Sequence, residues 1–286
     1  MKEAAPQDTE TLEDGRVFLE KLRLREGIPT DSEVAVVVAH PDDESIAFGA
    51  QLARFPGGMI IHVTDGAPEN PKEWNSKGFG TKQEYADVRK QELNNALDIA
   101  GHTGLRTSLG VSDQRAPFTL AQNAERLARL FLEQHTKFVL THSYEGGHPD
   151  HDATAFAVHA ARALLQKEGV EIFIIEAPVY RGEGDEIVWQ DFASSDDAKS
   201  VQLPLTGEDR ILKEKLFAAH KSQRDTFPKV STEAEWLRLA PRYNFNELPN
   251  NGTLSRIFTK VGISSEKWLE LTNTALKALG LATPSL

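Results

Sequence analysis

Short β-branched runs alternate along this chain with longer segments in which apolar residues recur every three to four positions. The first pattern predicts strands and the second predicts helices. Strands are expected at residues 34–39, 59–63, 106–109, 138–141, 170–177 and 200–205. Helices are expected at residues 15–26, 46–53, 83–100, 153–166 and 209–226, with a further one beginning at Thr119. Strands alternating with helices indicate an α/β sheet built from right-handed βαβ units.

The run at 34–39 has no polar residue on either face. A continuous apolar run is typical of a central parallel strand that helices cover on both sides. No linker or repeat divides the chain, so we predict one domain at residues 15–286 after a flexible tail at 1–14. Its core is expected at about 33–227, and a helical, loop-rich C-terminal extension at 228–286.

Charge and cysteine content exclude several classes of function. The net charge of −11 argues against a nucleic-acid or anionic-membrane partner, because both require clustered Lys and Arg. With no cysteine, the chain has no disulfide, no thiolate metal site and no cysteine nucleophile. The polar start lacks an apolar leader and no run reaches membrane-spanning length, so we expect a cytoplasmic protein. Self-association to a homo-oligomer stays open.

Histidines and acids follow two of the predicted strands. His-Pro-Asp-Asp-Glu stands at 40–44, after the first strand, and His-Pro-Asp-His stands at 148–151, after the strand at 138–141. In open α/β sheets the site lies outside the carboxyl ends of the strands, so these segments are expected to meet. His40, Asp43 and His151 would then offer two imidazoles and a carboxylate, a donor set typical of catalytic zinc. The same donors also suit ferrous iron.

The neighbouring residues fit the other roles that a hydrolytic metal site needs. Asp42 is the expected general base. His148 is expected to stabilise an oxyanion, and Asp150 to hold His148 protonated through a hydrogen bond. Taken alone, each motif is more often a solvated loop or surface decoration, and Glu44 fits a helix N-terminus that favours negative charge. Their joint occurrence at two strand ends favours the metal site.

These motifs resemble those of the PIG-L (LmbE-like) N-deacetylase family, whose signature pairs Ala-His-Pro-Asp-Asp-Glu with a later His-Pro-Asp-His. Both stand unchanged, at 39–44 and 148–151. Three weaker family features are present as well: an Arg-x-x-Glu from Arg89, a Leu-Gly-x-x-Asp ending at Asp113 and a His-x-Ser-Gln from His220. The resemblance covers residues of about 34–223.

The resemblance implies a Rossmann-like, three-layer α/β sandwich with a mostly parallel central sheet. It implies zinc-dependent removal of the N-acetyl group from an N-acetylglucosamine-containing sugar or glycoside. The metal ligands would be those named above, with Asp42 as base and His148 at the oxyanion. Arg89 and Asp113 would hold sugar hydroxyls, and His220 would line the pocket.

Three alternatives stay open. The same mechanism would also hydrolyse another N-acylated metabolite or a chitin oligosaccharide. The same scaffold would suit a sugar-binding protein without catalytic activity. A ferrous oxygenase is compatible with the donor set alone. The chain departs from the family after Gly66, where Ala-Pro-Glu replaces the usual Gly-Glu. The loop at 68–80 fits a lid or sugar platform, and substrate identity is expected in this loop, at 181–199 and after 227.

Overall fold

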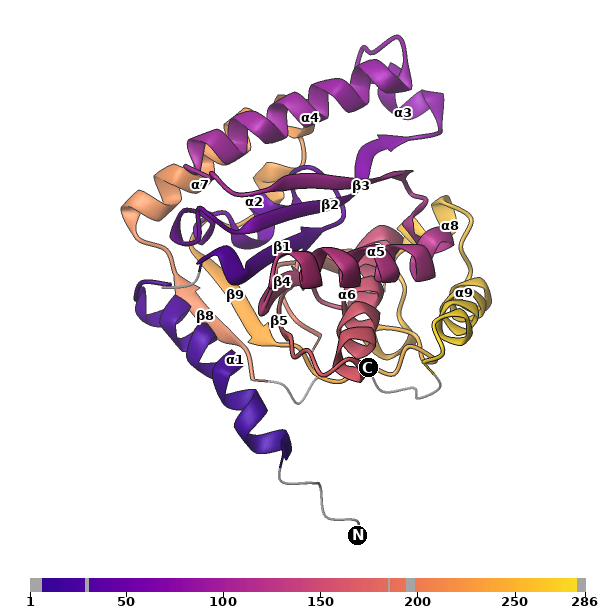
Figure 1. Cartoon of the computed structure of the whole chain (residues 1–286). Coiled ribbons are helices and arrows are strands. Elements are labelled where there is room, and N and C mark those ends of the chain that lie inside the picture. The colour runs from indigo at the N-terminus through magenta and orange to yellow at the C-terminus, as the bar shows by residue number, and fades with distance from the viewer. Residues whose placement is uncertain (1–6, 29–30, 185, 194–198, 282–286) are drawn as a thin grey trace.

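The computed structural model describes residues 7–28, 31–184, 186–193 and 199–281. In this part of the chain, seven strands form one sheet in the order β3-β2-β1-β4-β5-β9-β8 (Figure 1). The strands are β1 (Val34–Val38), β2 (Met59–Pro68), β3 (Arg106–Asp113), β4 (Phe138–His142), β5 (Phe173–Ala177), β8 (Val201–Pro204) and β9 (Ala234–Leu239). The pairs from β3 to β5 are parallel, whereas β9 runs antiparallel to both β5 and β8.

Helices cover both faces of this sheet, as the uninterrupted apolar strand at its centre predicts. One hydrophobic cluster joins α1 (Gln7–Leu24), α2 (Asp43–Phe48), α4 (Lys82–Ile99) and α7 (Gly207–Ala219) to the sheet. The other joins α5 (Leu120–Glu133), α6 (Pro149–Lys167), α8 (Arg256–Lys260) and α9 (Ser265–Ala278) to its opposite face. The predicted three-layer, mostly parallel α/β fold is therefore confirmed.

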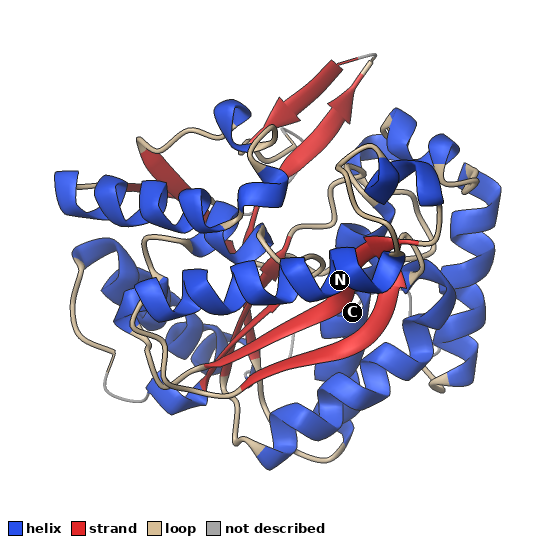
Figure 2. Cartoon of the chain, turned by 90° about the horizontal axis from the view of Figure 1, so that it is seen from above, coloured by secondary structure: helices blue, strands red, loops and turns tan. Residues whose placement is uncertain are grey.

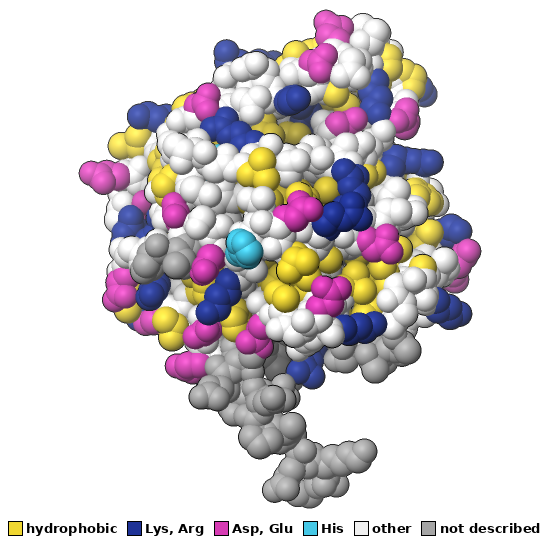
Figure 3. Space-filling model, viewed as in Figure 1, with side chains coloured by type: hydrophobic (Ala, Val, Ile, Leu, Met, Phe, Trp, Pro, Cys, Tyr) yellow, Lys and Arg dark blue, Asp and Glu magenta, His cyan; other side chains and the backbone are white. Residues whose placement is uncertain are grey.

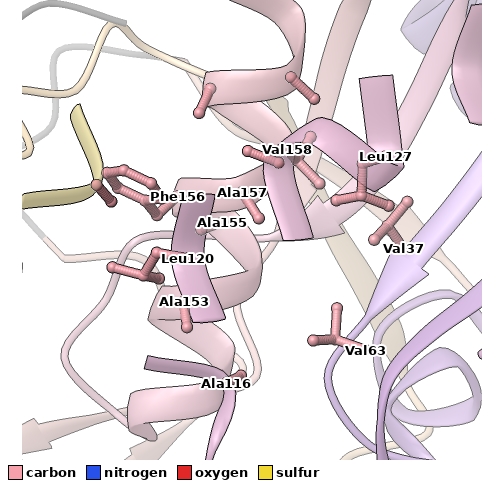
Figure 4. Close-up of a cluster of buried hydrophobic side chains, with 14 of the residues drawn as sticks. Val37, Val63, Ala116, Leu120, Leu127, Ala153, Ala155, Phe156, Ala157 and Val158 are labelled. Atoms are coloured by element: carbon pink, nitrogen blue, oxygen red, sulfur yellow. The ribbon is translucent and has the colours of Figure 1, made fainter. Parts of the chain in front are cut away.

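Strand β1 shows how one run of side chains serves both layers. Successive side chains of a strand point to opposite faces. Val36 accordingly packs in the cluster of α2 and α4, while its neighbour Val37 packs in the cluster of α5 and α6. Figure 4 shows the second cluster, with Val37 beside Leu127 of α5. Both clusters exclude water from the strand that leads into the histidine-rich motif.

The order of the strands reverses at the centre of the sheet. From β1 the chain moves outward through β2 and β3, and it then returns to add β4 and β5 on the other side of β1. Connections on the two sides of such a point diverge, and this leaves a crevice outside the carboxyl ends of the two strands. The histidine motifs follow β1 and β4, so both lie at this crevice.

The sequence misplaced some boundaries, and it missed β9 as well as a two-stranded hairpin. Helix α1 begins at Gln7, inside the tail expected at 1–14, of which residues 1–6 lie outside the described part. Strand β9 lies within the sheet, although 228–286 was expected to follow the core. The sequence did not reveal this strand because it contains Glu235 and Arg238, and charged residues are normally exposed. In the structure both are almost fully buried. Glu235 accepts a hydrogen bond from Lys213 (2.7 Å), and Arg238 donates to Glu176 (2.6 Å).

A second, two-stranded sheet lies outside the main one. The antiparallel hairpin of β6 (Tyr180–Glu183) and β7 (Glu186–Trp189) projects from the rest of the chain (Figure 2). On the face seen in Figure 3, basic and acidic side chains are interspersed, and no basic patch stands out. In the part of the chain that the structure describes, no helix is both long and apolar enough to cross a membrane.

Helix α7 is held at its start by a capping box and by an ion pair. The side chain of Thr206 accepts from the backbone N–H of Asp209, whose carboxylate accepts from the N–H of Thr206. Arg25, just after α1, donates to both carboxylate oxygens of Asp209 at 2.6 and 2.8 Å. Although burial raises the pKa of Asp209, the hydrogen bonds from Arg25 and Thr206 lower it to about 2.

This cap makes the stability of the fold depend on pH in one direction. A depressed pKa means that the Asp209 carboxylate stabilises the fold above its ordinary pKa of 3.8 and that this contribution is lost as the pH falls toward about 2. Asp209→Asn is expected to lower the free energy of unfolding by about 1 kcal/mol at pH 7. Urea unfolding should show the difference from wild type shrinking below pH 4. Asp191→Asn is the control, since its ion pair with Arg181 is exposed.

Candidate functional site

At the carboxyl end of β1, hydrogen bonds link the chain to both neighbouring strands, β4 and β2. The backbone N–H of Ala39, just after β1, donates to Nε2 of His142 at the end of β4 (2.9 Å). The carbonyl of Ala39 accepts from the N–H of Thr64 in β2 (2.9 Å). These contacts fix the point at which the chain leaves β1, and they place His40 directly above the crevice.

The three expected metal ligands lie together at this point. His40 Nδ1 is 3.2 Å from Asp43 Oδ2, and Asp43 Oδ1 is 3.5 Å from His151 Nε2. A ring nitrogen of His40 and one of His151 lie within 4.8 Å of each other. His40 and Asp43 share the turn between β1 and α2, whereas His151 comes from the first turn of α6. Two distant segments therefore bring two imidazoles and one carboxylate to a single place.

The surrounding charges favour a cation between these side chains. Burial by itself lowers the pKa of His40, but the carboxylates of Asp113 and Asp43 raise it well above its ordinary value. The pKa of Asp43 is held well below its ordinary value, against the effect of burial, by His151 and His40. Nδ1 of His151 is buried and has no hydrogen-bond partner among the described residues. These donors fit a divalent metal ion bound by nitrogen and oxygen ligands.

Two residues of the site were not assigned a role from the sequence. The ring of His142 stacks on that of His151, with 4.1 Å between centroids and 9° between planes. The ring of Tyr180 lies 5.1 Å from His151, and Trp189 lies 4.8 Å from Tyr180 in the hairpin. The only signal for His142 and Tyr180 was their place at or shortly after the ends of β4 and β5, because nothing in the sequence pairs them with His151.

Asp42 is buried beside the ligands and has a strained backbone. Its φ is 143° and its ψ −24°, a combination that side-chain-bearing residues rarely adopt. Arg89 of α4 donates to Asp42 Oδ1 (3.0 Å), to the carbonyl of Pro41 (2.7 Å) and to that of Gly66 (2.7 Å). Burial raises the pKa of Asp42 to about 6, even though the charge of Arg89 lowers it. The guanidinium thus holds both the carboxylate and the turn that carries it.

Arg89 and His220 were expected to contact a sugar, but the structure places both behind Asp42. Arg89 is 5% exposed and has three protein acceptors. His220 is fully buried, with Nε2 lying 3.3 Å from both Glu44 and Ser45. Glu44 in turn accepts from the backbone N–H of Asp42 (3.0 Å) and lies 2.9 Å from His62 Nε2. These residues support the turn from inside, because α4 and the segment after α7 pack against it.

His148 and Asp150 also differ from expectation in how they interact. Nδ1 of His148 accepts from the backbone N–H of Asp150 (3.1 Å), so its proton is on Nε2. The Asp150 carboxylate lies 4.0 Å from that nitrogen and accepts instead from the N–H groups of Gln114 (2.6 Å) and Ala116 (3.0 Å). Burial and the neighbouring His40 lower the pKa of His148 well below its ordinary value. The Asp150 carboxylate thus faces backbone N–H groups, and His148 presents its Nε2–H to the site.

Asp113 and Asp150 flank the far side of the His40 ring. Asp113 Oδ1 is 3.1 Å and Asp150 Oδ2 is 3.2 Å from His40 Nε2. Donor atoms of these three residues and of His148 all lie within 4.8 Å of one another. Of the expected sugar-binding residues, only Asp113 thus reaches the ligand cluster.

Residues 35–162 match the profile of the PIG-L family, described as GlcNAc-PI de-N-acetylase. The chain is 27% identical over 139 residues to a probable N-acetyl-alpha-D-glucosaminyl L-malate deacetylase 2 of Bacillus anthracis. This alignment covers 47% of the chain and 61% of that relative, so the chain spans less than two thirds of its length.

Two further matches extend over more of the chain. A 1D-myo-inositol 2-acetamido-2-deoxy-alpha-D-glucopyranoside deacetylase of Thermomonospora curvata is 26% identical over 227 residues, covering 71% of this chain and 69% of the relative. A solved deacetylase–teicoplanin complex from teicoplanin biosynthesis superposes with a TM-score of 0.56 at 16% identity, covering 72% of this chain and 96% of that one. At that identity, the structural likeness shows the fold alone.

The packing of Arg89 between Asp42 and Gly66 predicts that a side chain at Gly66 destabilises the fold. A Cβ at Gly66 would lie 2.5 Å from Arg89 Nη1 and 2.8 Å from Pro41 Cδ, at a φ of +64°. Gly110 is a matched control, because its φ is +68° and nothing lies within 4 Å of a Cβ there. Gly110→Ala should cost about 1–2 kcal/mol of stability from the left-handed backbone alone.

Gly66→Ala should cost at least about 1 kcal/mol more than Gly110→Ala, because Arg89 or the Pro41 turn must also shift. Chemical denaturation measures both variants. Equal losses in the two would show that Arg89 is not packed against Gly66 as described.

Proposed function

We propose that this chain is a member of the PIG-L family and a metal-dependent hydrolase that removes the N-acetyl group from an N-acetylglucosamine-containing sugar or glycoside. The observation that carries this proposal is the meeting of His40, Asp43 and His151 beside a buried, strained Asp42. A site that only bound a sugar would need no such carboxylate. The names of the relatives support an amino-sugar substrate.

Zinc is the metal that we propose for the site. His40, Asp43 and His151 would hold it and leave room for water and substrate, as catalytic zinc sites with three protein ligands do. When bound, zinc lowers the pKa of a water molecule and polarises the acetyl carbonyl. His142 would act through another residue, since its stacked ring fixes the plane of the His151 imidazole.

Asp42 would be the general base. Its carboxylate takes a proton from the attacking water and passes one to the nitrogen of the leaving amine, so that acetate and the free amine are released. Arg89 supports this role in two ways. Its positive charge keeps Asp42 ionised despite burial, and its bonds to the carbonyls of Pro41 and Gly66 hold the strained turn in place.

His148 would stabilise the oxyanion that forms when the carbonyl is attacked. Because its Nδ1 accepts from the N–H of Asp150, its Nε2–H is the group free to donate. A neutral imidazole suffices for this hydrogen bond, so the reaction does not require His148 to be protonated. Asp113, at the edge of the cluster with 13% of its side chain exposed, would accept from a sugar hydroxyl.

Removal of the metal tests the cofactor. Purified protein is expected to contain about one divalent ion per chain by elemental analysis, because the candidate donor groups overlap at His40 and His151. Dialysis against a chelator should abolish acetate release and lower Tm, since an ion that binds only the folded state stabilises it. Added zinc should restore both. Full acetate release from metal-free protein would contradict the proposal. Recovery of activity with ferrous iron but not with zinc would identify iron as the metal of the site.

Asp42→Asn tests the base. The variant should release acetate about a hundredfold to ten-thousandfold more slowly than wild type, the usual loss when a general base is removed. Its metal content should stay the same, because the side chain at this position is not expected to be a ligand. Asp98→Asn, at an exposed carboxylate paired with Arg106, is the matched control and should keep the wild-type rate. Undiminished acetate release by Asp42→Asn would rule out this mechanism.

A substrate panel separates the alternatives. Acetate release is measured on N-acetylglucosamine, its oligomers, its glycosides and amides with longer acyl chains. A preference for glycosides supports the proposal, whereas a preference for chitin oligomers or long acyl groups favours the related amidases. A tight sugar complex without product would indicate a binding protein.

A further inference from the structure

The loop at 143–147 carries the chain from β4 to His148, and its inner side is fixed by a buried acid. Asp152 in the first turn of α6 accepts from the backbone N–H groups of Glu145 (2.9 Å) and Gly146 (3.1 Å). These bonds tie the loop to the helix that it precedes. The carbonyl groups of Gly146 and Gly147 have their partners in another part of the chain.

Those partners come from the C-terminal part of the chain. The backbone N–H of Ser255 donates to the carbonyl of Gly146 (2.8 Å), and its hydroxyl donates to the carbonyl of Gly147 (2.5 Å). Ser255 is 3% exposed, so water does not compete for these bonds. The Gly147 carbonyl belongs to the peptide unit that ends at His148. Because a peptide unit is planar, a group that fixes this carbonyl also fixes the N–H and Cα of His148.

The packing around this contact leaves no room for the loop to slide. A Cβ at Gly147 would lie 1.8 Å from the carbonyl oxygen of Tyr180, and one at Gly146 would lie 2.5 Å from that of Thr253. A Cβ at Gly182 in β6 would lie 2.9 Å from Cα of Ser255. Three backbone segments therefore touch directly, so a shift in one must move the others.

A second contact from the same region holds the start of the loop. Nε1 of the fully buried Trp268 in α9 donates to the hydroxyl of Tyr144 (2.7 Å), which itself donates to the carbonyl of Glu247 (3.0 Å). The C-terminal part of the chain therefore contacts the loop near its start, at Tyr144, and at its end, at Gly147. The metal-ligand residues lie on other elements, the β1–α2 turn and α6.

We propose that Ser255 is a positioning residue for His148, and that the segment at 250–281 braces the loop on which His148 stands. The inference rests on the proposed function, in which His148 donates to the oxyanion. Loss of the brace would move His148 and leave His40, Asp43 and His151 in place. It should therefore lower kcat without loss of metal, which general unfolding of the site would not do.

Full-length Ser255→Ala, loaded with zinc, tests the brace. Its kcat for acetate release should fall about tenfold or more, since small misplacement of a catalytic group has large effects. Its KM and metal content should stay within about twofold of wild type. Ser255 also caps α8 by accepting from Ile257. The control is therefore Ser264→Ala, which removes the equivalent cap of α9 and should keep the wild-type kcat.

Amide hydrogen exchange gives a readout that does not depend on activity. Exchange at 144–148 should quicken about tenfold in Ser255→Ala and stay unchanged in Ser264→Ala. A kcat within twofold of wild type, or a fall matched by loss of zinc, would overturn the brace. If Ser255→Ala does not fold, Tyr144→Phe removes the second contact, and unaltered kcat and loop exchange in it would overturn the proposal.

The failure of the proposed function would look different. Wild-type protein that releases no acetate from any amide of the panel contradicts that function, whatever Ser255 does. In that case, amide hydrogen exchange in the loop is the measurement that tests whether Ser255 braces it. Unchanged exchange in Ser255→Ala refutes it, and faster exchange at 144–148 retains Ser255 as the residue that places His148.

Discussion

The site depends on one constraint, which is that its buried charged side chains must have compensating partners. A buried carboxylate is costly unless a cation or several hydrogen-bond donors face it. Asp43 has imidazoles on two sides, Asp42 has the guanidinium of Arg89, and Glu44 has His62 and His220. Each acid of the motif at 42–44 is thus matched by its own partner. Three adjacent carboxylates can be buried here because α4, α6, β2 and the segment after α7 supply partners, together with His40 of the same turn.

The same rule explains parts of the fold that lie far from the site. Strand β9 enters the sheet with the buried residues Glu235 and Arg238, whose charges are matched by Lys213 and Glu176. Removing one member of such a pair leaves the other charge uncompensated. The pairs therefore fix which strand lies beside β5. They also join the C-terminal part of the chain to the sheet whose edge carries the histidines.

In the proposed function, the reaction and the choice of substrate would rest on different parts of the molecule. The ligands and Asp42 stand on the turn after β1 and on α6, within the segment matched by the family profile. The hairpin of β6 and β7 and the segment after β9 lie beyond that segment. Tyr180 and Trp189, which are paired in this hairpin, form a series of ring contacts that starts at His151. A shared reaction centre is thus compatible with different substrates, and the fold alone does not choose among them.

The sequence by itself determined the layered α/β fold and the strand ends at which the site forms. The apolar run at 34–39 marks a buried central strand, and the motifs at 40–44 and 148–151 are local, so their spacing is visible without coordinates. The partners of these residues were decided by the tertiary structure. Arg89 and His220 turn inward behind Asp42, Asp150 binds the amides of Gln114 and Ala116, and Ser255 reaches the loop before His148. The physical reason is that hydrogen bonding between groups far apart in the chain depends on packing direction, which periodicity and motif spacing do not encode.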